Sequence, residues 1–249
     1  MIDSLFYFGY GPVVGLYLLA RVLHAAGRPL PARWLLRLGA LLHAVFLGSR
    51  VVSAGVILPL AAVEATFFIP WVVAELALLP QRGGETACEN EAPLAWLALL
   101  LALPALFLPH GPLPPFVKAA SVHAFLFFLC EGAAHACFYG AAWLSLRRHG
   151  APPSRAHGLA VWGFVLYSIG QVTGSIWCDL GWGSPFLWSQ RHLGSAAIWL
   201  WYAGYLHLRF LPGRGGRGRK AMLVAGALIA LGFLAAGLVT EMRQLRMGN

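Results

Sequence analysis

The stretch SVHAFLFFLCEGAAHACFYGAAWLSL, residues 121–146, is almost entirely apolar and carries one carboxylate and two histidines. An α-helix needs about 20 predominantly apolar residues to cross a lipid bilayer. Because lipid offers the backbone no hydrogen-bond partners, a chain that enters it must satisfy its N–H and C=O groups internally, as a helix does. The sequence therefore predicts a transmembrane helix over about 117–146.

Similar apolar runs occur on both sides of this segment. The composition agrees with them, because 59% of the 249 residues are hydrophobic and only 11% are charged, whereas soluble domains carry about 25% charged residues. We expect an all-α fold, a polytopic membrane helix bundle of about eight transmembrane helices. The loops are too short for a second core, so residues 1–249 form a single transmembrane domain. The other seven spans are predicted at about 4–25, 35–54, 57–79, 93–109, 158–177, 193–211 and 221–240.

The distribution of basic residues predicts the orientation of the chain. With eight spans, one set of loops holds 13 of the 18 Lys and Arg residues, including the run GRGGRGRK (213–220), and the other set holds 5. The positive-inside rule makes the first side cytoplasmic. Both termini then lie on the outer, periplasmic side of a multi-pass protein of the inner (cytoplasmic) membrane. The net charge of +9 is interpreted as contact with anionic membrane lipid, not with nucleic acid.

Four histidines fall inside predicted spans, where an ionisable residue is costly and indicates function. His43 and His207 are expected at similar depth in the inner leaflet, and His123 near the outer face, level with His192. His135 lies deeper in the span that His123 begins. Paired imidazoles with few carboxylates nearby suit haem iron better than a hard cation. Each of them can alternatively be a core side chain that makes hydrogen bonds.

The segment WCDLGWGSPFLWSQRH (177–192) concentrates three tryptophans between two apolar runs. Its glycines and Pro185 disfavour helix, so we expect a tryptophan-rich outward loop over 177–192. The pattern W-x-x-x-x-W-G-S-x-x-x-W within it resembles the tryptophan-rich "WWD" segment of the CcsA/ResC cytochrome c assembly family. The stretches YLHLR (205–209), LLHAVFLGSR (41–50) and LPLAAVEATFFIPW (58–71) are also similar to that family, and the resemblance covers about residues 38–210.

This resemblance implies that haem passes from a site inside the membrane to an outward-facing aromatic platform. There it is presented to the Cys-x-x-Cys-His motif of a periplasmic apocytochrome. The implied cofactor is haem b, in one copy or two, and the implied partners are a c-type cytochrome or apocytochrome, membrane lipid and further membrane subunits. By position, His43 and His207 are the axial ligands of the membrane haem, His123 is the first external ligand, and Trp177, Trp182 and Trp188 form the platform.

The chain departs from the family pattern where the family has W-D-P-K-E. Ser189 replaces the aspartate, Gln190 replaces the proline, and Phe186 replaces one tryptophan. The family's second external histidine is absent from the C-terminal tail, which offers only Met242 and Met247 as soft ligands. His192 is a candidate substitute for that histidine.

Three interpretations follow from this pattern. The first is a haem-binding protein that assists the assembly of c-type cytochromes. The second is a b-haem membrane subunit that transfers electrons between quinol and a periplasmic redox partner without attaching haem. The third is a scaffolding or regulatory relative without a cofactor, in which both inner histidines would have no role. No catalytic residue is assigned in any of them.

Overall fold

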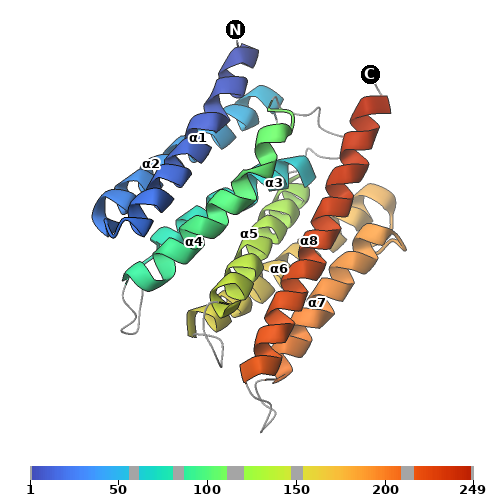
Figure 1. Ribbon diagram of the computed structural model, residues 1–249. Coiled ribbons are helices and arrows are strands. Elements are labelled where there is room, and N and C mark those ends of the chain that lie inside the picture. Colours follow the sequence, from blue (N-terminus) through green and yellow to red (C-terminus); the bar gives the residue numbers. More distant parts are fainter. Residues whose placement is uncertain are drawn as a thin grey trace. The chain divides into compact units, whose positions relative to one another are not determined.

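The computed structural model describes residues 2–55, 62–80, 87–110, 121–146, 154–208 and 216–247, and all of the regular structure in these ranges is helical (Figure 1). The expected all-α fold is therefore confirmed. The helices are α1 (Ile2–Ala25), α2 (Pro29–Ala54), α3 (Ala62–Leu78), α4 (Ala87–Ala102), the 3₁₀ turn η1 (Pro104–Phe107), α5 (Val122–Leu146), α6 (Ser154–Trp182), α7 (Gln190–Leu208) and α8 (Gly216–Met247).

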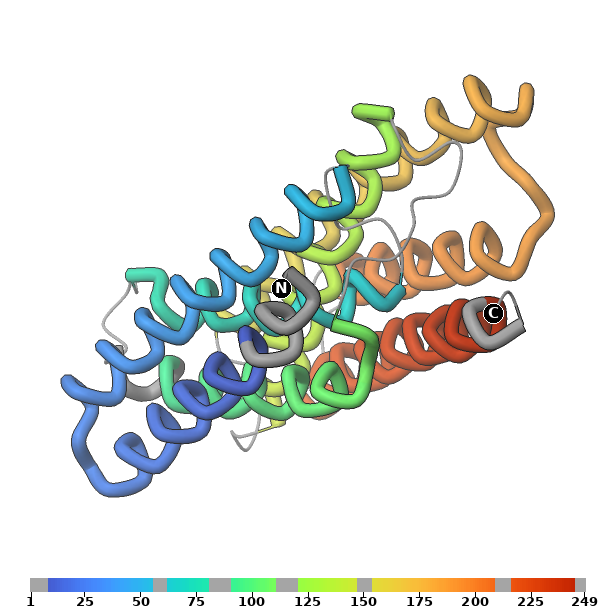
Figure 2. The backbone as a smooth tube through the Cα atoms, turned by 90° about the horizontal axis from the view of Figure 1, so that it is seen from above, coloured from blue at the N-terminus to red at the C-terminus, as the bar shows by residue number. Residues whose placement is uncertain are grey.

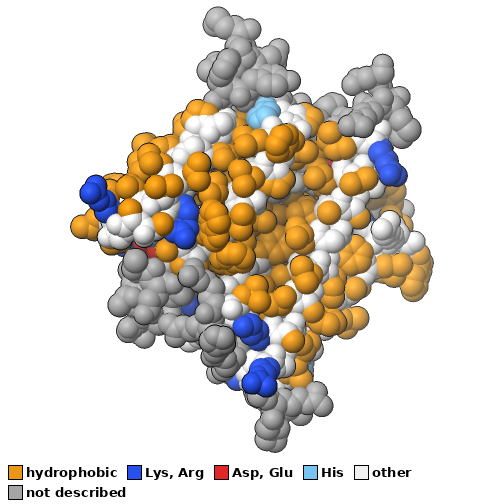
Figure 3. Space-filling view, in the orientation of Figure 1, with side chains coloured by type: hydrophobic (Ala, Val, Ile, Leu, Met, Phe, Trp, Pro, Cys, Tyr) orange, Lys and Arg blue, Asp and Glu red, His pale blue; other side chains and the backbone are white. Residues whose placement is uncertain are grey.

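Within the described ranges, four helices are long and apolar enough to cross a membrane. They are Pro29–Ala54, Val122–Leu146, Ser154–Trp182 and Gly216–Gln244. The short apolar run predicted at 93–109 is divided, because Pro104 ends α4 and begins η1. Apolar side chains cover most of the helix surfaces that Figure 3 displays, and only a few Lys and Arg side chains interrupt them. Such a surface suits lipid, and the protein is a helical membrane protein.

The first of two compact units comprises residues 1–58 and 66–116. In it α1 and α2 form a hairpin that turns at Gly27, whose φ of 71° favours glycine (Figure 2). Gly39 permits the close approach of these two helices, since a Cβ there would lie 2.8 Å from the Tyr17 ring. The resulting contact places the Tyr17 hydroxyl beside His43 on α2.

The second unit comprises residues 59–65 and 117–249. Here α5 packs along α6 and also contacts α8, while α7 packs on α6 and α8 (Figure 1). Glycines allow this close packing, as is common between membrane helices. A Cβ on Gly163 would lie 2.6 Å from Phe138, and a Cβ on Gly174 would lie 2.7 Å from Phe127. The start of α3 belongs to this unit through the Val63 amide, which donates to the Glu241 carboxylate on α8 (3.0 Å).

The tryptophan-rich segment is more helical than its composition predicts. The expectation of a loop over 177–192 is wrong at both ends, since α6 continues to Trp182 and α7 begins at Gln190. Gly181 is accommodated in the helix, and Gly183, with φ of 71°, ends it by donating its amide to the Asp179 carbonyl (2.8 Å). The connecting segment is therefore only residues 183–189, as the tube in Figure 2 shows.

Candidate functional site

A cavity of about 700 Å³ lies in the second unit, between α5, α6, α7 and the 183–189 segment. Its volume is within the range of small-molecule and cofactor sites. The wall is mostly apolar and aromatic, and the polar groups on it are few. The aromatic side chains are Phe127, Trp177, Phe186 and Trp199, and the main polar ones are Gln171, Cys178, Arg191, His192 and Ser195.

Local hydrogen bonds and one glycine shape the cavity. Gly174 leaves room for the Phe127 ring to lie against α6, where a Cβ would clash with it. The Ser175 hydroxyl donates to the Pro185 carbonyl (2.9 Å), which ties the 183–189 segment back to α6. The Ser184 hydroxyl donates to the Phe186 carbonyl (2.8 Å) and stabilises the turn. These contacts keep Phe186 against the cavity.

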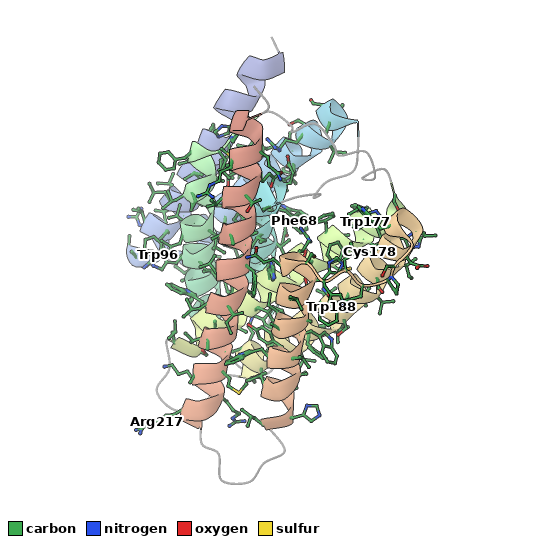
Figure 4. All side chains as sticks on the ribbon, turned by 90° about the vertical axis from the view of Figure 1, so that its right-hand side faces the viewer. Phe68, Trp96, Trp177, Cys178, Trp188 and Arg217 are labelled. Carbon is green, nitrogen blue, oxygen red and sulfur yellow. The ribbon has the colours of Figure 1, made fainter. Side chains whose placement is uncertain are left out.

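The three predicted platform tryptophans have different environments. Trp177 is buried in the wall, with ring centroids 5.8 Å from Phe128 and 5.4 Å from Trp182. Trp182 is half exposed, and Trp188 is 86% exposed and contacts Phe186 edge to face. Figure 4 shows Trp177 and Cys178 together near the end of α6 and Trp188 apart from them. The structure thus brings Trp177 and Trp182 together, with Trp188 on the connecting segment.

Both ring nitrogens of His192 have partners in the second unit. Ser189 Oγ lies 2.8 Å from Nδ1, and the Cys178 thiol lies 3.3 Å from Nε2. The Phe186 ring packs edge-on against the imidazole at 5.4 Å. A thiol is a weak hydrogen-bond donor, so a metal can displace it from Nε2 while the serine holds the ring in place. This arrangement suits a histidine ligand with an orienting partner.

Arg191 supplies the positive charge of the cavity. Its Nη2 donates to the Glu131 carboxylate on α5 (2.9 Å), and its guanidinium lies over the rings of Phe127 (5.2 Å) and Phe128 (4.8 Å). The neighbouring Glu131 partly neutralises this charge, because its carboxylate pairs with Arg191 on α7. A guanidinium in an apolar wall can bind a carboxylate of a ligand.

His207 and His123 lie at opposite ends of the second unit's helices. His207, in the last turn of α7, is exposed and donates its Nδ1–H to the Ala203 carbonyl (2.7 Å). That bond fixes the tautomer and leaves the Nε2 lone pair for a metal. His123 is the second residue of α5 and is partly exposed, and it is not among the described residues that line the cavity.

His43 lies in the first unit and is fully buried. Its Nδ1 is 3.1 Å from the Tyr17 hydroxyl, and the Tyr10 ring packs edge-on against it at 5.3 Å. The backbone of Phe67 lies close to the ring, but Nε2 makes no well-formed hydrogen bond with the described residues. A buried nitrogen without such a partner suits a metal ligand.

Sequence reasoning did not select Arg191, Cys178 or Ser189 as site residues, and the structure places all three at the cavity or next to His192. The only available signal for Cys178 was its position beside Trp177. No group of three or more His, Cys, Asp or Glu side chains that could hold a metal ion occurs in the described part of the chain.

Comparison with known families identifies the chain. The model of the family described as cytochrome C assembly protein matches residues 97–244, more than half of the sequence. The chain belongs to the cytochrome c assembly protein family. The matched range contains the whole cavity, the 183–189 segment and His207.

Curated relatives support this membership. "Cytochrome c biogenesis protein CcsA" of Prochlorococcus marinus subsp. pastoris is 37% identical over 84 residues, 30% of this chain and 26% of the relative. The protein of the same name from Synechococcus sp. (strain CC9311) is 38% identical over 76 residues, 30% of this chain and 24% of the relative. The protein of the same name from Prochlorococcus marinus (strain MIT 9515) is 41% identical over 63 residues, which are 25% of this chain and 20% of the relative. The matched segment thus spans between a fifth and about a quarter of each relative's length.

Proposed function

We propose that this member of the cytochrome c assembly family binds haem b in the membrane and presents it at the outer face for c-type cytochrome biogenesis. The observation that carries the proposal is the cavity of about 700 Å³, in which an aromatic wall meets one imidazole and one guanidinium. A flat, apolar macrocycle with carboxylate substituents matches this combination, because aromatic rings stack on it and a guanidinium pairs with its carboxylates.

The residues present fit haem. In the cavity, His192 would ligate the iron through Nε2, Trp177 would pack on the ring, and Arg191 would bind a carboxylate. Haem bound there supplies the vinyl groups that become thioether bonds to an apocytochrome. The protein's own part is to hold the ring by apolar burial, fix the imidazole through Ser189 and keep the cavity largely free of water.

For the membrane haem we propose His43 and His207 as ligands, with His123 as an outer ligand. Tyr17 beside His43 and the Ala203 carbonyl beside His207 support these roles, because each binds Nδ1 and leaves Nε2 for iron. We propose an inner-membrane location with eight crossings and both termini on the periplasmic side. Reporter fusions after residue 249 and within 147–153 test this orientation, since they should report opposite sides of the membrane.

Haem content of the purified protein tests the proposal. We expect b-type haem by pyridine haemochrome, a partial loss in His192→Ala, and a separate partial loss in the double variant His43→Ala/His207→Ala. His24→Gln is the matched control, because His24 contacts the Ala20 carbonyl and Glu91, and glutamine can keep both contacts. Unchanged haem in both sets of variants would contradict the assignment.

A second experiment distinguishes the cytochrome assembly function from the electron-transfer function by asking whether the bound haem leaves the protein. Incubation with a reduced peptide that carries Cys-x-x-Cys-His should deplete the protein's haem and yield a covalent haem peptide. Haem that stays bound at full occupancy and is reduced by a quinol analogue would instead indicate the b-haem electron-transfer subunit. A protein purified without haem would favour the scaffolding interpretation.

A further inference from the structure

A file of buried polar side chains extends through the second unit from the cavity. It is made by Ser195, Tyr202 and Tyr205 on α7, Tyr167 and His157 on α6, and His135 and Tyr139 on α5. All of them except His157, which is partly exposed, are at most 7% exposed. The proposed haem site uses none of these side chains except Ser195, which is part of the cavity wall.

The file begins at the cavity. Ser195 lines the cavity and lies near Tyr167, whose buried hydroxyl makes no hydrogen bond with the described residues. The Tyr167 ring lies against His135, with ring centroids 5.9 Å apart, and His135 stacks on Tyr139 at 5.8 Å. Three helices thus place hydroxyl and imidazole groups next to each other in the centre of the unit.

The file ends at the opposite end of α6. Tyr202 stacks on Phe138, which precedes Tyr139 in the chain, with ring centroids 3.5 Å apart. It lies three residues before Tyr205 on α7, so the two tyrosines are neighbours on one side of that helix. The Tyr205 hydroxyl then lies 3.2 Å from His157 Nδ1, and His157 is in the first turn of α6. From Ser195 to Tyr205 the file descends ten residues of α7, about 15 Å at 1.5 Å per residue.

Several polar atoms along this path have no hydrogen-bond partner among the described residues. They are Nε2 of His135, the hydroxyls of Tyr139, Tyr167 and Tyr202, and Nε2 of Gln171 at the cavity wall. Buried polar groups are nearly always paired with protein or ordered water. Since one buried water usually bridges about three polar groups, waters between these atoms would complete a hydrogen-bonded chain.

We propose that this file conducts protons between the cavity and the His157 end of the helix bundle. A proton that binds at one end is matched by a proton released at the other, and in between only O–H and N–H bonds are exchanged, so no electron moves. Glu131 and Arg191 form an ion pair at the cavity end of the path. This function does not require haem in the cavity.

Proton flux into vesicles tests the proposal. The purified protein is reconstituted into liposomes that contain a pH-sensitive dye, and a potassium gradient with valinomycin sets the membrane potential. We expect a flux above that of empty liposomes, and its loss in Tyr202→Phe and in Tyr139→Phe, which keep the rings but remove the hydroxyls. Tyr10→Phe is the control, because the Tyr10 hydroxyl is equally buried but lies in the first unit and donates to the Ala102 carbonyl.

A wild-type flux equal to that of empty liposomes would overturn the proposal, as would full flux in both tyrosine variants. If one variant fails to incorporate, the other still decides, because the two tyrosines lie on different helices. Loss of flux in Tyr10→Phe as well would show a general packing effect and would also overturn it. The haem content of the same preparations is measured separately, so failure of the proton path leaves the haem proposal untouched.

Discussion

Arg191 on α7 and Glu131 on α5 form an ion pair at 2.9 Å directly beside the cavity. The arginine side chain is half exposed and the glutamate is mostly buried. Exposed pairs of this kind contribute about 1 kcal/mol or less to stability. The pair therefore matters more for the charge of the cavity wall than for folding.

This relationship predicts opposite effects of two substitutions on porphyrin binding. Arg191→Gln removes the only guanidinium among the described residues that line the cavity, so affinity for a porphyrin with free carboxylates should fall about tenfold, the worth of one charge-assisted hydrogen bond. Glu131→Gln releases Arg191 from its partner and should raise that affinity. Titration by tryptophan quenching measures both, and the dimethyl ester of the porphyrin is the control, since its binding should be unaffected by either change.

We expect substitutions of two tryptophans to have different effects, one on the stability of the fold and the other on the transfer of haem. Trp177→Ala empties a site enclosed by Phe127, Phe128 and Trp182 and should cost about 3–5 kcal/mol of unfolding free energy. Trp188→Ala removes a side chain that is 86% exposed and should leave stability nearly unchanged. Thermal unfolding in detergent compares the two. In the haem-transfer assay Trp188→Ala should be slower than wild type, and equal rates would remove Trp188 from the platform.

The sequence predicted the helices well because membrane helices are specified by long apolar runs. The run predicted at 158–177 became α6, and the run at 193–211 became α7 with ends shifted by three residues. The prediction from sequence was wrong at residues 177–182, where the glycine content indicated a loop. The helix continues there because Trp177 packs against α5, and that tertiary contact outweighs the low helix propensity of Gly181.

The site was only partly predictable for a related reason. Single histidines and tryptophans stand out in an apolar sequence, but Arg191 was interpreted only as one of a few charges on the outer side. Its pairing with Glu131 joins residues 60 positions apart, and no local pattern encodes such a contact. The bond from Ser189 to His192 is similar, because Ser189 stood only as a departure from the family aspartate. Its hydroxyl nevertheless binds the imidazole that replaces the missing ligand in our proposal.

Acidification should destabilise the first unit through His110, which follows η1 at the end of the fourth apolar run. Burial, and then the positive charge of Arg50, lower the pKa of this imidazole below its usual value near 6.5. Below that pH the unfolded chain binds a proton that the folded chain resists, so stability falls as the pH falls. The slope is at most about 1.4 kcal/mol per pH unit.

Thermal unfolding at pH 7.5 and 5.5 checks this expectation. Wild type should lose stability between the two values, and His110→Gln should lose less, because glutamine does not titrate. The backbone carbonyl of residue 110 remains available to Arg50 in the variant, so the comparison isolates the side chain. An identical pH dependence in both proteins would show that another group controls the acid response.

Two glycines of α6 provide a matched test of the packing between α5 and α6. A Cβ on Gly163 would lie 2.6 Å from the Phe138 ring, which itself stacks on Tyr202 at 3.5 Å, whereas a Cβ on Gly158 meets nothing within 4 Å. Gly163→Ala should therefore cost about 1–3 kcal/mol through overpacking. Gly158→Ala should be neutral or stabilising by up to about 1 kcal/mol, because alanine favours helix.

Since Phe138 cannot move without disturbing Tyr202, Gly163→Ala should also reduce the proton flux, while Gly158→Ala should leave it intact. Equal stability of the two variants would mean that α5 can shift away from α6 at no cost.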